Sequence, residues 1–210
     1  MKKIYLFACL LLTNSVFSQI VFEESFETGN TNNIKPEGWY CGATPKWLAG
    51  NGEQSHNRTA RTGNWYAHFP YNSNSWMFKQ VSLVANQTYE FSMWFKTDGI
   101  AGFQYEVKWG SDSLGTAMIN DIQPLTAINN TEFQQTIQTF TPTVSGVYYI
   151  GIHGIATNSP WYLTVDDIML KAVNAYGFEL TRVTPDTIAY AGSHYDYKVK
   201  IKNTGINADT

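Results

Sequence analysis

The chain has 210 residues and a formal charge of −3, and its charged and its aromatic residues each make up 15% of the composition. Proteins that bind nucleic acids usually carry a basic patch or stripe. The sequence has no such lysine- or arginine-rich run, so we expect no nucleic-acid partner. Its wealth of aromatic, Thr, Asn and Gly residues favours strands and turns over helices.

Residues 1–18 have the features of a secretory signal peptide. Lys2 and Lys3 precede the apolar run 4–12, and residues 15–18 form a small-residue cleavage site. The apolar run is too short to span a bilayer, and no later stretch reaches that length. We therefore expect a secreted or cell-surface protein without membrane insertion. Its mature chain begins at Gln19 with 12 basic and 17 acidic residues, a formal charge of −5.

The mature chain keeps a single cysteine, Cys41, which excludes an internal disulfide. We expect this thiol to be buried beside Trp39 and Tyr40, because free cysteine behaves as a small apolar residue. A small secreted β domain without disulfides needs another source of stability, and a structural metal ion would provide it.

Alternating apolar and polar residues predict antiparallel strands. Tyr89, Phe91, Met93 and Phe95 alternate with polar or bulky neighbours, and residues 104–109 repeat this pattern. Turn signals separate further strand-like runs, and no amphipathic helix of normal length interrupts them. About nine strands in about 150 residues predict one β-sandwich, a jelly roll. The expected strands are 20–26, 65–69, 76–83, 89–96, 104–109, 136–140, 147–155 and 161–170.

Two short acidic motifs lie near the two ends of this body, Glu27 after the first strand and Asp166 with Asp167 in the last. The inward face of the last strand changes phase at this Asp pair, which predicts a one-residue bulge that redirects one carboxylate. Terminal strands of a sandwich often lie side by side, which would bring Glu27 to the pair. Charge alone leaves a solvated strand end and a metal site open. Carboxylate oxygens would favour calcium over zinc.

Several of these motifs, in this order, resemble the cleaved-adhesin or choice-of-anchor J family. They are Glu24 to Gly29, Gly38 and Trp39, Ala60 to Tyr66, Ser75 and Trp76, Tyr89 to Trp94, and Trp161 to Leu170. The family is a jelly-roll module similar in shape to MAM domains and carbohydrate-binding modules, and it occurs in bacterial surface adhesins. The resemblance covers residues 20–171.

The resemblance implies a non-catalytic domain with a structural calcium ion. In this chain the ion would be held by Glu27 and Asp166, with Asp167 as second choice, and by backbone carbonyls of residues 61–64. Two positions depart from the family pattern. The segment 61–65 replaces a small-residue turn, and Lys79 with Gln80 replaces a strand-ending proline.

The sequence offers little support for catalysis and more for binding. The four histidines lack metal-protease spacing, and no serine elbow or phosphate loop is present. Trp39, Trp76 and Trp94 occupy positions where core packing is the ordinary explanation. Five other rings lie in loops or at strand ends, where one or two would be exposed for binding: Trp47, Trp65, Tyr71, Trp109 and Trp161. We select Trp47 and Tyr71 as the candidate ligand-binding residues.

Beyond the body, residues 173–210 read as a linker and the first strands of an immunoglobulin-like domain. Tyr195, Tyr197, Val199 and Ile201 alternate with polar residues before a turn. Residues 173–210 are too few to bury an independent core. We therefore expect a domain that continues past residue 210. We thus predict a signal peptide at 1–18, a jelly-roll domain at 19–172 and an incomplete second β domain.

Three hypotheses about function remain open. The first is a calcium-stabilised adhesion module that binds an extracellular glycan or a surface protein. The second is an accessory domain of a longer secreted protease or glycoside hydrolase, and the third is an architectural spacer.

Overall fold

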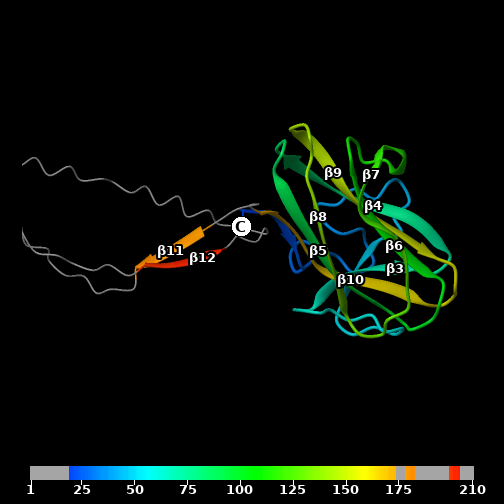
Figure 1. The fold of residues 1–210 in the computed structure, drawn as a ribbon. Coiled ribbons are helices and arrows are strands. Elements are labelled where there is room, and N and C mark those ends of the chain that lie inside the picture. Colours follow the sequence, from blue (N-terminus) through cyan, green and yellow to red (C-terminus); the bar gives the residue numbers. More distant parts are fainter. Residues whose placement is uncertain (1–18, 174–177, 183–198, 204–210) are drawn as a thin grey trace, which may run out of the picture. The chain divides into compact units, whose positions relative to one another are not determined.

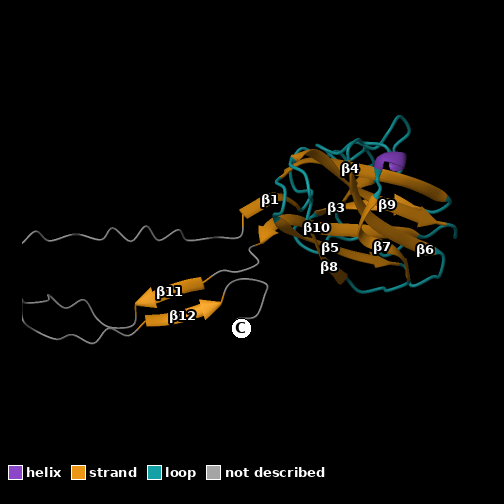
Figure 2. Cartoon of the chain, turned by 45° about the horizontal axis from the view of Figure 1, so that its top comes forward, coloured by secondary structure: helices purple, strands orange, loops and turns teal. Residues whose placement is uncertain are grey.

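The computed structural model describes residues 19–173, 178–182 and 199–203. Gln19–Val173 forms one compact unit of two facing β-sheets (Figures 1 and 2). Of the expected second domain, β11 (Phe178–Arg182) and β12 (Val199–Asn203) form an antiparallel pair. The expected signal peptide and the rest of 173–210 lie outside the described residues. Within the described part of the chain, no helix is long and apolar enough to cross a membrane.

The larger sheet, here sheet A, has six strands. Its order is β2-β3-β10-β5-β8, and β1 pairs with β10 beside β3. The strands are β1 (Gln19–Glu24), β2 (Leu48–Asn51), β3 (Trp65–Pro70), β5 (Thr88–Thr97), β8 (Gln134–Phe140) and β10 (Tyr162–Val173).

The smaller sheet, sheet B, has the order β4-β9-β6-β7. Its strands are β4 (Ser73–Leu83), β6 (Phe103–Gly110), β7 (Asn120–Ile128) and β9 (Gly146–Ala156), and a single 3₁₀ turn η1 (Gly115–Ala117) joins β6 to β7. Every pairing in both sheets is antiparallel. The predicted all-β jelly-roll sandwich is confirmed.

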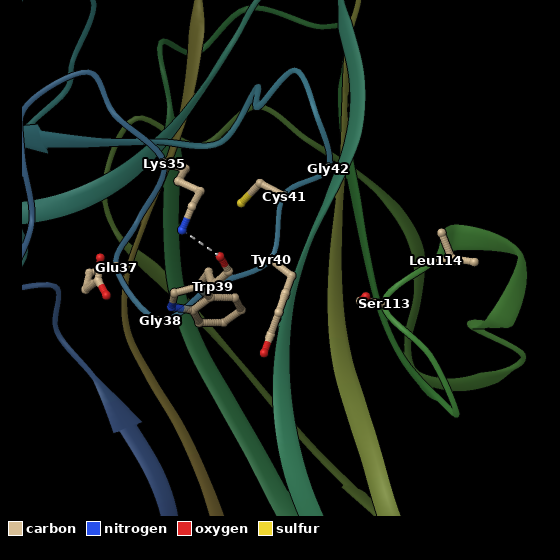
Figure 3. Close-up of a pocket in the computed structure, with 9 residues that line it drawn as sticks. All are labelled: Lys35, Glu37, Gly38, Trp39, Tyr40, Cys41, Gly42, Ser113 and Leu114. Atoms are coloured by element: carbon tan, nitrogen blue, oxygen red, sulfur yellow. Dashed lines mark hydrogen bonds between the residues drawn. The ribbon is translucent and has the colours of Figure 1, made fainter.

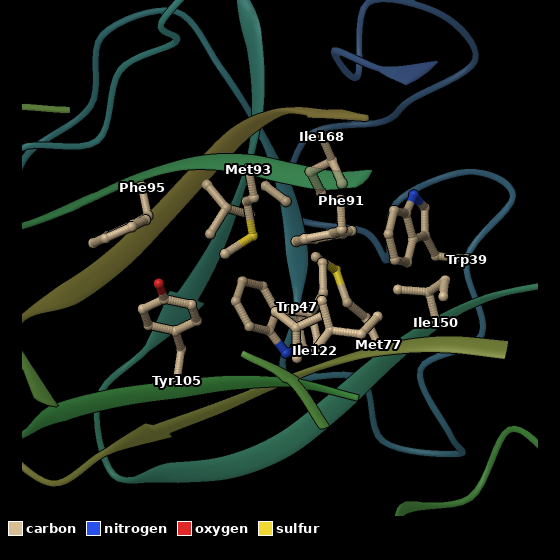
Figure 4. Close-up of a cluster of buried hydrophobic side chains, with 14 of the residues drawn as sticks. Trp39, Trp47, Met77, Phe91, Met93, Phe95, Tyr105, Ile122, Ile150 and Ile168 are labelled. Atoms are coloured by element: carbon tan, nitrogen blue, oxygen red, sulfur yellow. The ribbon is translucent and has the colours of Figure 1, made fainter. Parts of the chain in front are cut away.

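The core lies between the sheets and is built from the alternation in the sequence. Tyr89, Phe91, Met93 and Phe95 of β5 all belong to it. Figure 4 shows Phe91, Met93 and Phe95 among apolar residues of sheet B such as Ile150. Trp39 and Cys41 are buried with them, as expected. Burial raises the pKa of the Cys41 thiol to about 11, so it remains protonated and unreactive.

Trp76 and Trp94 were expected in the core and lie outside it. Both sit at positions that alternate with core residues, on the sheet faces that point away from the centre, and both are half-buried. Trp76 stacks on His153 of β9 with 4.3 Å between ring centroids, and the Arg61 guanidinium lies 3.8 Å from the centre of the Trp94 ring.

The junction that positions the candidate metal site is formed by three strands. One edge of β10 pairs with β3 through residues 162–165 and with β1 through residues 168–172. The first and last strands of the domain therefore lie side by side, as the sequence predicted (Figure 2). Asp166 and Asp167 occupy the gap between the two partners, where the register against β5 shifts.

Candidate functional site

The carboxylate of Asp166 is buried at this junction and accepts three backbone hydrogen bonds. Its Oδ2 lies 2.7 Å from the Arg61 N–H nitrogen and 3.3 Å from that of Thr62, and its Oδ1 accepts from Asp167 N at 2.7 Å. Burial raises the pKa of Asp166 to about 7, and the neighbouring Asp167 charge acts in the same direction, against the hydrogen bonds. A nearby positive charge would favour the ionised form of this buried carboxyl.

The predicted bulge is present and turns Asp167 to the same loop. Consecutive side chains of a regular strand point to opposite faces, yet Asp167 has φ +45° and joins Asp166 in contacting residues 61 and 62. Its Oδ2 lies 2.7 Å from Arg61 Nη1, and its Oδ1 accepts from Thr62 Oγ1 at 2.7 Å. Asp166 thus holds the backbone of this loop and Asp167 holds its side chains.

Glu27 reaches the same loop from the end of β1. Its Oε1 accepts from Asn64 N at 2.8 Å and from Trp65 N at 2.7 Å. The carboxylate lies where a side chain on Gly63 would be, since a Cβ there would fall 2.3 Å from Oε1. Thr62 N and Asn64 N, which bond to Asp166 and Glu27, are two residues apart and therefore at most about 7 Å from each other. The bonded carboxylate oxygens of Glu27 and Asp166 thus lie within about 13 Å of each other.

We call Glu27, Asp166 and Asp167 the acidic cradle, and residues 52–64, between β2 and β3, the strap. The resemblance implied that carbonyls of residues 61–64 face the acids. In the structure, it is the N–H groups of Arg61, Thr62 and Asn64 that bond to the carboxylates. The Asn64 carbonyl accepts a hydrogen bond from Gly52 N at 2.9 Å.

The donors of the cradle fit a hard cation in kind. A carboxylate offers about four acceptor positions, and the hydrogen bonds above leave positions open on both Glu27 and Asp166. Among the described residues, no three acidic, His or Cys side chains form a group that would hold a metal alone. Calcium would therefore complete its shell with hydroxyl, carbonyl or water oxygens, as it commonly does.

A second feature is a cluster of half-buried rings contributed by three loops. Tyr162, at the start of β10, contacts the rings of Tyr71 at 5.9 Å and His56 at 5.9 Å, and the Arg58 guanidinium lies 3.9 Å from its centre. Trp161 packs edge-on against His56 at 5.4 Å. We call His56, Tyr71, Trp161 and Tyr162 the aromatic loop cluster. Sequence reasoning found Tyr71 and Trp161 and missed Tyr162. It also missed His56 and Arg58, because they lie in the polar strap.

The other proposed ligand residue, Trp47, cannot contact a ligand, and that prediction is wrong. Its side chain is fully buried, lies 4.8 Å from Phe69 between ring centroids, and donates from Nε1 to the Ser75 carbonyl at 3.2 Å. Trp47 precedes β2 directly, and its loop folds inward so that the indole fills the core (Figure 4).

The structure also contains a groove that sequence reasoning did not find. It has a volume of about 610 Å³ and runs between residues 35–42 and the loop carrying Ser113 and Leu114 (Figure 3). Tyr40 is 49% exposed on its wall, and its backbone pairs with Phe78 on the edge of β4 that faces away from β9. Lys35 Nζ donates to the Trp39 carbonyl at 3.2 Å. We call this the Tyr40 groove.

Comparison with known proteins places the fold. No protein-family model and no curated protein sequence matches the chain. Among solved structures, the K1 cleaved adhesin domain of Lys-gingipain from Porphyromonas gingivalis matches with a TM-score of 0.56 and 15% identity, over 72% of this chain and 97% of that one. The fold is that of a cleaved adhesin domain.

Two further structures share this fold. The N-terminal CBM22 tandem domain of Xyn10C from Paenibacillus barcinonensis matches with a TM-score of 0.53 and 15% identity, over 84% of this chain and 49% of that one. An arabinose-bound α-L-arabinofuranosidase matches with a TM-score of 0.52 and 14% identity, over 74% of this chain and 27% of that one. The cleaved-adhesin fold thus also occurs in carbohydrate-binding modules and as one part of a larger enzyme chain.

Proposed function

We propose that this chain is a secreted, non-catalytic binding module that recognises an extracellular glycan through the aromatic loop cluster and is stabilised by calcium at the acidic cradle. The observation that carries the proposal is the convergence of half-buried rings from three loops, around Tyr71, Trp161 and Tyr162. Ring faces with adjacent polar groups are what a sugar-binding surface requires, because they pack on C–H groups while polar groups bind hydroxyls.

Polar groups accompany these rings. Arg58 covers Tyr162, and Asp98 accepts from Tyr162 N at 2.8 Å through Oδ2. Burial raises the pKa of Asp98, while that hydrogen bond and the charges of His56, Arg58 and Lys96 act against the shift. The fold adds support, since the CBM22 tandem shares it.

Calcium at the cradle is the stabilising part of the proposal. The ion would be bound by Glu27 and Asp166, and its charge would hold the buried Asp166 ionised. Asp167 is already paired with Arg61, so we assign it a supporting role. Bound there, the ion would join the first strand, the last strand and the strap.

A glycan array on the whole chain, with calcium present, tests the binding role. We expect one class of glycan to bind, and Tyr71→Ala or Trp161→Ala to weaken it at least tenfold. Tyr40→Ala is the matched control, since it removes an exposed tyrosine from the separate groove. A wild-type chain that binds no glycan would refute the proposal, and loss only on Tyr40→Ala would move the site to the groove.

An accessory domain of a longer hydrolase is the second candidate, favoured by the match to one part of the arabinofuranosidase. Sequence beyond residue 210 distinguishes the two, because a catalytic signature there would assign the glycan-binding module to an enzyme.

A further inference from the structure

We propose that the glycan bound at the aromatic loop cluster is acidic, and that the Arg58 guanidinium binds the carboxylate of one of its sugar units. The inference rests on the proposed function, from which it takes the site, and adds the class of sugar. A guanidinium presents its N–H donors in one plane and can match a carboxylate with two parallel hydrogen bonds.

Arg58 is positioned by neutral groups alone. Its Nε donates to the Ser55 carbonyl at 2.9 Å, its Nη2 lies 3.4 Å from Ser55 Oγ, and its guanidinium lies 3.9 Å from the centre of the Tyr162 ring. Among the described residues, no carboxylate forms an ion pair with Arg58. Within the same part of the chain, no hydrogen bond reaches its Nη1. The side chain therefore has donors available for a ligand.

Arg61, the other arginine of the Gln19–Val173 unit, shows the contrast. It also lies over a ring, since its guanidinium is 3.8 Å from the centre of the Trp94 ring. Its Nη1, however, lies 2.7 Å from Asp167 Oδ2. Arg61 thus combines ring packing with an ion pair, whereas Arg58 has the ring packing without the ion pair. A ligand carboxylate would supply the missing partner.

The surrounding chain holds Arg58 in place. Its carbonyl accepts hydrogen bonds from Gln54 N at 2.8 Å and from Tyr66 Oη at 3.2 Å. The preceding residue, Asn57, donates from Nδ2 to the Thr97 carbonyl at 2.6 Å. A cation that is already positioned loses little conformational entropy when a ligand binds. The site is therefore suited to recognise a charged group at a fixed place.

Acidic groups near the site leave Arg58 without a direct partner. The charge of Asp98 interacts with both Arg58 and Lys96, and its Oδ2 already accepts a backbone hydrogen bond at 2.8 Å. Glu53 and Glu132 act on Lys96 from exposed positions, where solvent screens their charges. A ligand carboxylate would form the ion pair that no described residue supplies to Arg58, while Asp98 Oδ1 could accept from a sugar hydroxyl.

Binding of matched acidic and neutral sugars to the whole chain tests the inference. The probes are oligosaccharides of galacturonic, glucuronic and sialic acid, each with its carboxyl-reduced counterpart, in which a hydroxymethyl group replaces the carboxylate. We expect at least one acid form to bind about tenfold more tightly than its reduced form. Added salt should diminish this preference. Arg58→Gln should abolish it, and Arg58→Lys should retain part of it.

The outcomes separate this inference from the proposed function. Lys35→Gln, which removes an exposed positive charge from the separate Tyr40 groove, is the matched control and should keep the preference. Equal binding of acidic and reduced forms, or binding of neutral glycans alone, would overturn the acidic class and leave glycan binding in place. A preference for the acid that survives in Arg58→Gln would overturn the role of Arg58. No binding of any glycan would overturn the proposed function itself.

Discussion

The buried His68 yields the sharpest quantitative prediction. It lies in β3, is 2% exposed, and neither ring nitrogen has a hydrogen-bond partner. Its ring contacts Tyr66 at 6.1 Å and Tyr162 at 5.6 Å between centroids. Burial, with the nearby Arg58 charge, lowers the pKa of His68 from 6.5 to about 3. The folded protein therefore keeps this imidazole neutral.

The sign of the effect follows from proton linkage. Above pH 6.5 the group is neutral in both states, so it carries no penalty, and below 6.5 only the unfolded chain takes up the proton. Stability then falls by about 1.36 kcal/mol per pH unit. From pH 7.5 to pH 5.0 the loss attributable to His68 is about 2 kcal/mol.

Asp166 titrates in the opposite sense and must be separated from this effect. Its folded pKa is raised to about 7, so the folded state takes up a proton first and stability rises as pH falls from about 7 toward 3.8. The measured quantity is therefore the difference in free energy of unfolding between wild type and His68→Leu. Distant groups cancel in that difference.

Urea unfolding followed by tryptophan fluorescence provides the assay. All seven tryptophans lie within residues 39–161, so the emission reports on the Gln19–Val173 unit alone. We expect the stability of His68→Leu relative to wild type to increase by about 2 kcal/mol between pH 7.5 and pH 5.0. His56→Asn, a half-buried loop position with φ +63° that suits asparagine, is the matched control. A relative stability that does not change with pH would refute the reasoning.

Three further predictions concern the packing. Trp47→Ala should destabilise the domain by about 3–5 kcal/mol, because it empties a fully buried indole site, and a loss under 1 kcal/mol in urea unfolding would contradict that burial. Trp94→Ala should cost about 1 kcal/mol, since a half-buried ring loses its contact with the Arg61 guanidinium, and a loss as large as that of Trp47→Ala would place it in the core. Gly50→Ala should cost about 1–3 kcal/mol by thermal melting, because its Cβ would fall 2.4 Å from the ring of Tyr66, and an unchanged melting temperature would show that this ring moves freely.

The fold was largely predictable because its central strands alternate. The alternation in β5 placed Tyr89, Phe91, Met93 and Phe95 in the core without reference to any partner. The bulge was predictable too, because the apolar phase of β10 changes at Asp166, and only an extra residue brings Leu163 and Ile168 to the same face.

Two strands were missed for physical reasons. β2 has only four residues and includes Gly50, whose missing side chain makes room for Tyr66. β7 is an edge strand of sheet B and contains Pro124, which an edge tolerates because one side of the β7 backbone has no partner among the described strands. Both lack the alternation by which a half-buried central strand is recognised.

The candidate sites were predictable only in part. Asp166 and Asp167 were found because paired acids in an apolar strand are costly, and Glu27 was found through its motif after the first strand and the family resemblance. The structure brings all three to one loop. The role of the strap was not predictable, because a polar segment reads as an exposed loop until its partners are known. The prediction that Trp47 binds a ligand was wrong because a tryptophan in a loop sequence gives no sign that the loop folds inward.

Calorimetric titration of the whole chain with calcium tests the central claim most directly. We predict one binding site in wild type, strongly weakened in both Glu27→Gln and Asp166→Asn, with Asp112→Asn, an exposed loop acid, as the unchanged control. Saturation at about 100 times the dissociation constant should stabilise the fold by about 2.7 kcal/mol. No calcium-dependent heat in wild type, together with the same melting temperature in calcium and in chelator, would contradict the account.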